Sequence, residues 1–191
     1  PYDRVMGQEG STMSKRFLIV VDMQNDFIDG SLGTPEAVAI VGNVVEKIKQ
    51  YIADPDGDVY ATRDTHQPDY LQTQEGKNLP VEHCIKGTEG WALRPEIAAL
   101  IPEDHVFNKP TFGSTELAAA MKEKYDEADG DVTFELVGLC TDICVASNAL
   151  LLKATMPEAV ISIDPACCAG VTPEKHDAAL ETMRSCQIQG A

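Results

Sequence analysis

The sequence predicts a three-layer α/β fold, in which helices cover both faces of a mostly parallel central sheet. Apolar runs at 17–21 and 159–163 are typical of strands that are covered on both faces, as in parallel sheets. Segments whose apolar residues recur at helical spacing alternate with such runs along the chain. We therefore expect one α/β/α domain over residues 13–191.

The remaining elements follow from shorter patterns. Further strands are expected at 58–62, 105–108 and 132–137, and a last strand would begin at 187–189. Helix starts are marked by proline, serine, threonine or aspartate. The expected helices begin at Pro35, span 91–100, and begin at Ser114 or Thr115, at Thr141 or Asp142, and at Pro173. Residues 1–12 show no periodicity, so we expect them to be an added or disordered extension outside the fold.

Charge and cysteine content restrict the function. Asp and Glu number 31 against 15 Lys and Arg, which gives a net charge of −16. Nucleic acids and anionic membrane surfaces repel such a chain, so we expect neither as a partner. No apolar run has the length of a transmembrane helix, and the six cysteines lack the density of a disulfide scaffold. We expect a cytoplasmic protein with reduced thiols and a small-molecule substrate, and the sequence is compatible with a homo-oligomer.

Cys144 is the first candidate for a catalytic residue. It follows the expected strand at 132–137 and the strand-breaking Gly138, and it falls in the first turn of the next helix. The free N–H groups and the dipole of a helix start stabilise an anion, which predicts a thiol of lowered pKa and a nucleophile. The same N–H groups could hold the oxyanion formed when a carbonyl is attacked. The alternative is that Cys140 and Cys144 are small packing residues.

Asp22 and Lys109 also follow expected strands, those at 17–21 and 105–108. Because the carboxyl ends of parallel strands meet at one edge of the sheet, both side chains should converge with Cys144 there. A lysine beside a cysteine would stabilise its thiolate. The alternatives are a capping role for Asp22 and a solvated cation at Lys109.

A carboxylate and two imidazoles form a second candidate site. Asp64 and His66 end the expected strand at 58–62, and a polar loop then carries Glu75 and His83. One carboxylate with two histidines suits Zn²⁺, Fe²⁺ or Mn²⁺ and leaves positions for water or substrate. By spacing alone, His83 could equally be a surface or hydrogen-bonded histidine.

Taken in order, these motifs resemble those of the isochorismatase-like cysteine hydrolases, and within them nicotinamidases. The resemblance covers residues 17 to about 189. It depends on Val20-Val21-Asp22-Met23-Gln24-Asn25-Asp26-Phe27, Thr62-Arg63-Asp64-Thr65-His66, His83-Cys84 with Gly87-Thr88-Glu89-Gly90, Lys109, and Gly138-Leu139-Cys140-Thr141-Asp142-Ile143-Cys144-Val145.

The resemblance implies roles for the candidate residues. Cys144 would be the nucleophile, Asp22 the base and Lys109 the group that stabilises the charged pair. The backbone N–H groups of Cys140 and Cys144 would form the oxyanion hole, and the bond between Leu139 and Cys140 matches a cis peptide of the family. The implied metal ligands are Asp64, His66 and His83, with Glu75 as a further candidate.

The implied reaction is hydrolysis of nicotinamide to nicotinate and ammonia through a thioester. The resemblance also implies one divalent metal ion that holds the pyridine nitrogen of the substrate, with Zn²⁺ expected first and Fe²⁺ or Mn²⁺ as alternatives. One departure from the family concerns residues 78–82, which lack the large aromatic that nicotinamidases often place before the histidine matching His83. We expect Phe27 and Phe112 to line the substrate pocket instead.

That departure keeps a second substrate class open, namely another small amide, ureido or carbamoyl compound. A true isochorismatase is disfavoured, because family members with that activity lack the cysteine found at Cys144. A non-catalytic binding module on the same fold is a further alternative. So is a thiol-redox protein, although Cys140 and Cys144 have C-x-x-x-C and not C-x-x-C spacing.

Overall fold

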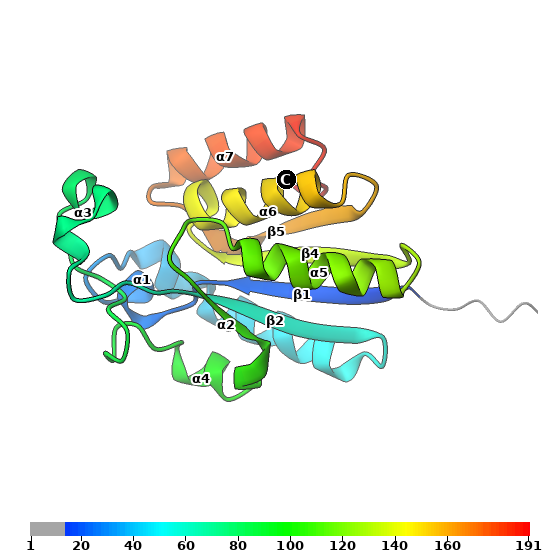
Figure 1. Ribbon diagram of the computed structural model, residues 1–191, viewed down its shortest axis with the longest axis horizontal. Coiled ribbons are helices and arrows are strands. Elements are labelled where there is room, and N and C mark those ends of the chain that lie inside the picture. The colour runs from blue at the N-terminus through cyan, green and yellow to red at the C-terminus, as the bar shows by residue number, and fades with distance from the viewer. Residues whose placement is uncertain (1–13) are drawn as a thin grey trace, which may run out of the picture.

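The computed structural model describes residues 14–191 and confirms the three-layer α/β/α architecture (Figure 1). The expected extension at residues 1–12 lies outside the described residues. Five strands form one sheet in the order β3-β2-β1-β4-β5, and each adjacent pair is parallel. The strands are β1 (Lys15–Val21), β2 (Gly57–Asp64), β3 (Val106–Lys109), β4 (Val132–Leu139) and β5 (Val160–Ala169).

Helices cover both faces of this sheet. Along β1, Phe17 and Ile19 face one core, whereas Leu18 and Val20 face the other. The first core is closed by α5 (Thr115–Glu127), α6 (Ala146–Thr155) and α7 (Pro173–Ser185), which lie together on one side of the sheet in Figure 1. The second core is closed mainly by α2 (Pro35–Ala53), with α1 (Asn25–Ile28) and α4 (Pro95–Ala98) beside it.

Side chains cap three of the long helices, and of these caps the sequence predicted Ser114. The hydroxyl groups of Thr34, Ser114 and Thr172 each accept a hydrogen bond from an N–H in the first turn of α2, α5 and α7. Proline occupies the first position of α2 and of α7. Shorter elements complete the chain: α3 (Gln74–Asn78), 3₁₀ turns at Tyr70–Gln72 and Glu103–His105, and a π-helical turn at Thr141–Val145.

The start of α6 differs from the prediction. Neither Thr141 nor Asp142 caps this helix, which begins after the π-helical turn with no side-chain cap. The hydroxyl of Thr141 bonds instead to Nδ1 of His176, and a carboxylate oxygen of Asp142 accepts from the N–H of Val171. Asp142 therefore ties the turn to the loop between β5 and α7, and Thr141 ties it to the first turn of α7.

Three further predictions needed correction. The helix expected over 91–100 is only α4 (Pro95–Ala98), because a residue before proline is driven to extended backbone and Arg94 adopts it. β5 continues past residue 163 through an irregularity in its pairing, where an edge strand tolerates Pro165. The last expected strand is a single bridge of Gln189 to Ser162, flanked by the positive φ angles of Gln187 and Gly190.

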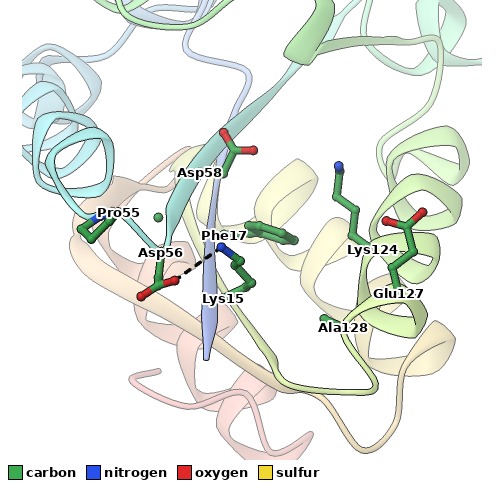
Figure 2. Close-up of a pocket in the computed structure, with 9 residues that line it drawn as sticks. Lys15, Phe17, Pro55, Asp56, Asp58, Lys124, Glu127 and Ala128 are labelled. Atoms are coloured by element: carbon green, nitrogen blue, oxygen red, sulfur yellow. Dashed lines mark hydrogen bonds and ion pairs between the residues drawn. The ribbon is translucent and has the colours of Figure 1, made fainter. Parts of the chain in front are cut away.

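The parallel sheet has two unlike edges. The carboxyl ends of the strands carry the candidate catalytic residues, while the amino ends border an open cavity of about 450 Å³. Figure 2 shows that cavity, where Lys15 pairs with Asp56 at 3.4 Å. In residues 14–191, the longest apolar helical stretches fall short of what a membrane span requires.

Gly138 permits a close backbone contact at the carboxyl end of β4. Its φ is +120°, and a Cβ there would lie 2.1 Å from the carbonyl oxygen of Val21. We predict that Gly138→Ala lowers the free energy of unfolding by at least about 3 kcal/mol, through strain and overpacking. Urea denaturation measures this loss.

Gly42→Ala is the matched control, because Gly42 lies within α2 and a Cβ there meets no atom within 4 Å. That variant should raise the free energy of unfolding by about 0.5–1 kcal/mol. If Gly138→Ala and Gly42→Ala had equal free energies of unfolding, the close backbone contact between β4 and β1 at Gly138 would be contradicted.

Candidate active site

The structure brings Asp22, Lys109 and Cys144 together. The ammonium of Lys109 lies 2.7 Å from Oδ2 of Asp22 and 3.3 Å from Sγ of Cys144. It also donates to the carbonyl oxygen of Thr111 at 3.1 Å. Lys109 is 1% exposed and Cys144 is 6% exposed, so this cluster is almost wholly enclosed by protein.

Strand register determines this convergence. Asp22 follows β1 with a φ of +48°, donates its N–H to the carbonyl of Thr62 and accepts the Thr62 hydroxyl on Oδ1 at 2.7 Å. Lys109 ends β3 directly opposite Asp64, which ends β2. Because β1, β2 and β3 are neighbours in the sheet, the ammonium of Lys109 lies between the carboxylates of Asp22 and Asp64.

Burial dominates the electrostatics of the triad. It raises the pKa of Asp22 and, together with the Asp22 charge, raises the pKa of Cys144 well above its usual value. Burial alone would lower the pKa of Lys109, but the charges of Asp22, Cys144 and Asp64 outweigh it and raise that pKa. The lowered pKa predicted for Cys144 is therefore wrong, since its pKa is shifted upward, which favours the protonated thiol.

Asp22 is placed to receive that proton. Its Oδ2 is buried and lies 2.7 Å from the Lys109 ammonium, and a hydrogen bond with Asp22 contributes to the raised pKa of Cys144. The oxygen therefore keeps a lone pair beside the ammonium and the thiol. This arrangement is chemically suited to proton transfer from a nucleophile.

The turn that carries Cys144 begins at Cys140. The bond between Leu139 and Cys140 is cis, as the family resemblance implied. The carbonyl of Cys140 accepts from the N–H groups of Ile143 and Val145, at 3.0 and 3.1 Å. Cys140 and Cys144 both line one cavity, which is a space where a carbonyl group could sit.

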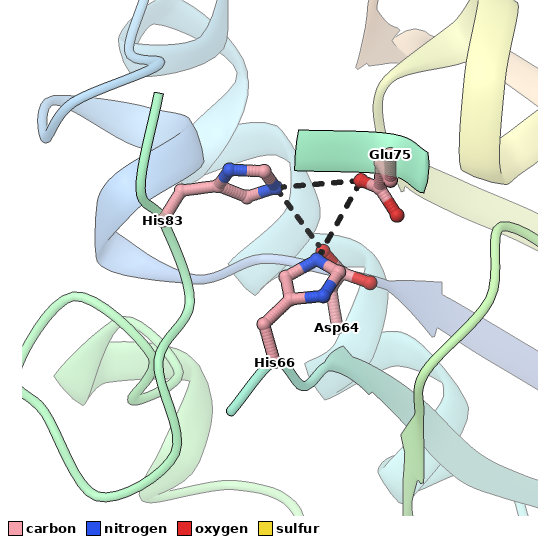
Figure 3. Close-up of side chains that lie close together, drawn as sticks. All are labelled: Asp64, His66, Glu75 and His83. Atoms are coloured by element: carbon pink, nitrogen blue, oxygen red, sulfur yellow. Dashed lines mark hydrogen bonds and ion pairs between the residues drawn. The ribbon is translucent and has the colours of Figure 1, made fainter. Parts of the chain in front are cut away.

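The four predicted metal-ligand candidates also converge, as Figure 3 shows. Nε2 of His66 lies 2.8 Å from Oδ2 of Asp64 and 3.6 Å from Oε1 of Glu75. Nε2 of His83 lies 3.5 and 3.8 Å from the same two oxygens. Donor atoms about 2.0–2.2 Å from a tetrahedral ion are about 3.3–3.6 Å apart, so this group fits a divalent metal.

The backbone around the cluster fixes the ligand atoms. The N–H of His66 donates to the carbonyl of Cys84, and the carbonyl of His66 accepts from Lys86, which places residues 83–86 alongside the end of β2. Nδ1 of His83 lies 2.8 Å from the carbonyl oxygen of Val81, which leaves Nε2 directed at the cluster. Glu75 lies in the first turn of α3, which Thr73 caps.

Asp64 belongs to both clusters. Its Oδ2 faces the histidines, and its Oδ1 lies 3.5 Å from the Lys109 ammonium. Burial alone would raise the pKa of Asp64, but hydrogen bonds from His66 and His83 and the Lys109 charge lower it below its usual range. Burial raises the pKa of Glu75. The carboxylates of Asp22, Asp64 and Glu75 thus outnumber the single ammonium of Lys109 in the two clusters, an excess of negative charge that a divalent cation would balance.

One cavity of about 280 Å³ connects the two clusters. Phe27 and Phe112, the predicted pocket residues, both line it. The ring of Phe27 lies 5.5 Å from that of His83, while Phe112 is 49% exposed at the rim. Other lining residues are Leu32, Thr34, Leu79, Ile143, Val171 and Lys175.

Sequence reasoning missed three buried residues behind this cavity. The side chain of Gln24 accepts a hydrogen bond from the N–H of Asp64 at 2.7 Å and donates one to the Asp64 carbonyl at 2.8 Å. Its position two residues after Asp22 is the only feature of the sequence that could have indicated this role. The ring of Tyr70 lies 4.7 Å from His66 and 4.9 Å from His83. Asn148 donates to the carbonyl of Cys144 at 2.8 Å. Nothing in the sequence pattern distinguishes Tyr70 or Asn148 from packing residues.

Removing the buried ammonium should destabilise the protein. We predict that Lys109→Met lowers the free energy of unfolding by about 3–5 kcal/mol, because it leaves Asp22 and Asp64 buried without their cation. Chemical denaturation measures the change. The control is Lys122→Met, which removes an exposed pair with Asp126 and should change stability by at most about 0.5 kcal/mol. Similar small losses in both variants would contradict the proposed balance of charge.

Comparison with known proteins identifies the family. The isochorismatase domain model matches residues 16–190. The isochorismatase family protein PncA of Bacillus subtilis is 31% identical over 71% of this chain and 77% of its own length. The nicotinamidase/pyrazinamidase of Mycobacterium tuberculosis is 28% identical over 91% of this chain and 97% of its own. The zinc complex of Pyrococcus horikoshii pyrazinamidase has a TM-score of 0.75 at 27% identity, covering 91% of this chain and 97% of its own. The chain therefore belongs to the isochorismatase family, where its relatives include nicotinamidases.

Proposed function

We propose that this chain is a metal-assisted cysteine amidohydrolase that converts nicotinamide and water to nicotinate and ammonia. One observation carries the proposal: Lys109 contacts Asp22 and Cys144 on one side and Asp64 of the metal-ligand cluster on the other, beside a single cavity. The nicotinamidase relatives support an amide-hydrolysing enzyme of nicotinamidase type.

In the first half-reaction, Sγ of Cys144 would attack the amide carbonyl carbon while Asp22 takes the thiol proton. The Lys109 ammonium would stabilise the thiolate as it forms. The backbone N–H groups of Cys140 and Cys144 would hold the oxyanion of the tetrahedral intermediate. Asp22 would then return its proton to the amide nitrogen, so that ammonia leaves and a thioester remains.

In the second half-reaction, Asp22 would take a proton from water, and the resulting hydroxide would attack the thioester carbonyl carbon. The same two N–H groups would hold the second oxyanion. The carbon–sulfur bond would break to release the carboxylate product, and the Cys144 thiolate would regain its proton. Enclosure of the cluster would keep bulk water from competing for that proton.

The residues that would hold the metal are Asp64, His66, His83 and Glu75. When bound, the ion would supply a Lewis-acid contact for the ring nitrogen of nicotinamide and so orient the carboxamide. We propose Zn²⁺, because carboxylate and imidazole donors at tetrahedral spacing suit it and the Pyrococcus relative is a zinc complex. Phe27 and Phe112 would provide apolar contacts for the ring.

The other candidate functions are less well supported. An ureido or carbamoyl substrate would use the same triad but would leave the four metal-ligand candidates without a role. A non-catalytic binding module would have no use for a thiol, a carboxylate and an ammonium in mutual contact. A redox role for Cys140 and Cys144 would not require Asp22 or Lys109.

The reaction is tested by ammonia release from nicotinamide with zinc-loaded protein. We predict that Cys144→Ala lowers kcat by about 10⁴-fold or more, because removal of a nucleophile abolishes the covalent route. The matched control is Cys186→Ala, which removes an exposed thiol and should leave the rate unchanged. A wild-type protein that releases no ammonia would exclude nicotinamide, and full activity of Cys144→Ala would exclude the thiol mechanism.

The metal cluster is tested by zinc competition with a chelating dye and by metal analysis. We predict one zinc per chain. His83→Ala and Glu75→Gln should each weaken zinc affinity by about 10-fold or more, since each removes a donor atom of the cluster. His105→Ala is the control, because His105 stacks on Tyr60 away from the cluster and should not change the affinity. Unchanged affinity in Glu75→Gln would leave a site of three protein ligands.

A further inference from the structure

The hydrogen bond between Thr141 and His176 is not used in the proposed reaction, yet it lies directly behind the nucleophile turn. Thr141 follows Cys140 in the chain, and its side chain is fully buried. Its Oγ1 lies 2.7 Å from Nδ1 of His176 on α7. A buried hydroxyl must find a partner, and this one finds it in an element 35 residues away in the chain.

His176 is held firmly enough to act as a fixed partner. The hydroxyl of Thr172 accepts the N–H of Lys175, and the carbonyl of Thr172 accepts the N–H of His176 at 3.0 Å. The backbone at Gly170 is packed so tightly that a Cβ there would lie 2.8 Å from the backbone nitrogen of His176. The imidazole therefore projects from a rigid helix start toward the turn.

A second contact joins the same two segments. Oδ1 of Asp142 accepts the N–H of Val171 at 3.0 Å. Two adjacent side chains, Thr141 and Asp142, thus anchor the beginning of the nucleophile turn to the segment from Val171 to His176. The Asp142 contact uses backbone N–H, whereas the Thr141 contact depends on the identity of residue 176.

We infer that His176 is a positioning residue for the oxyanion hole, acting through Thr141 on the N–H of Cys140. The peptide plane between Cys140 and Thr141 carries the Cys140 carbonyl, which accepts from Ile143 and Val145. The N–H of Cys140 belongs to the preceding peptide plane, between Leu139 and Cys140, and the two planes share the Cα of Cys140. A shift of Thr141 would therefore rotate Cys140 about this shared atom and displace its N–H relative to the carbonyl oxygen of a substrate. The inference rests on the proposed reaction, because that reaction assigns this N–H to the oxyanion.

The two roles of such a bond have different kinetic signatures. A contact that serves only to satisfy a buried hydroxyl would affect stability and leave the kinetics of the folded enzyme unchanged. A contact that aligns an oxyanion donor affects the transition state more than the bound substrate, so kcat falls while KM is retained. Because the donor would be misaligned and not removed, we expect a loss of about tenfold, below the 10²–10³ of a deleted donor.

The test compares three variants of the zinc-loaded full chain. His176→Leu removes the hydrogen bond at similar volume, while His176→Asn retains a polar atom at the place of Nδ1. Thr141→Val removes the hydroxyl from the other side. We expect kcat to fall about tenfold in His176→Leu and in Thr141→Val, with KM within about twofold, and no further fall in the double variant. His176→Asn should recover kcat to within about threefold of the wild type.

Two controls isolate the effect. Thr182→Val removes an exposed hydroxyl elsewhere on α7 and should leave kcat unchanged. Alkylation of Cys144 by iodoacetamide, followed by mass spectrometry, needs no oxyanion hole and should keep its rate in His176→Leu. An unchanged kcat in His176→Leu, a loss that His176→Asn does not repair, or a rise in KM without a fall in kcat would each overturn the inference.

Amide hydrogen exchange separates this inference from the proposed substrate. Exchange at residues 140–142 should be at least about tenfold faster in His176→Leu than in the wild type, and close to wild type in His176→Asn. If the wild-type protein releases no ammonia from nicotinamide, the proposed substrate fails, and exchange alone decides on His176. Unchanged exchange in His176→Leu would then overturn the positioning role.

Discussion

A buried ammonium is the constraint on which the site depends. Lys109 is almost completely enclosed, and an isolated charge in such a place would be strongly destabilising. The carboxylates of Asp22 and Asp64 stabilise it, and each stands at the end of a neighbouring strand. The sheet order β3-β2-β1 therefore stabilises the buried ammonium. It places the carboxylate of Asp64 at the end of β2, next to β3, and the carboxylate of Asp22 after β1, the following strand. Cys144, the proposed nucleophile, follows β4, the next strand, and its thiol completes the cluster by contacting Lys109.

The candidate catalytic triad and the metal-ligand cluster are not independent, because Asp64 of the cluster also contacts Lys109 of the triad. One carboxylate oxygen faces the two histidines and the other faces Lys109. A cation bound between the histidines would interact with the Asp64 carboxylate, the same negative charge that stabilises the ammonium. The ammonium would then depend more strongly on Asp22, which is also the proposed proton acceptor. Occupation of the metal site should thus tighten the pairing of Lys109 with Asp22, in addition to orienting a substrate.

The sequence predicted the features that are local to strand ends. Asp22, Asp64, Lys109 and Cys144 each follow a strand expected from the sequence, and parallel strands bring such residues to one edge. Features formed between distant segments were not predictable in the same way. The clamp of Gln24 on the backbone of Asp64 joins residues 40 apart. The pKa of Cys144 was predicted in the wrong direction, because a helix start is visible in sequence whereas the depth of burial is not.

The capping prediction for Thr141 and Asp142 failed for the same reason, because their contacts are with residues far away in the chain. A hydroxyl or carboxylate at the start of a helix normally accepts an N–H two or three residues later. Had Thr141 or Asp142 capped α6, the hydroxyl or carboxylate would have occupied the N–H of residue 143, 144 or 145. In the structure both side chains turn to the segment after β5 instead. In the proposed reaction the N–H of Cys144 binds an oxyanion, so it could not also bind a capping side chain. The stabilising contacts of this turn would then have to come from another element. Thr141 and Asp142 thus have the residue types of helix caps, but their contacts with His176 and Val171 leave the N–H groups at the start of the turn without a side-chain cap.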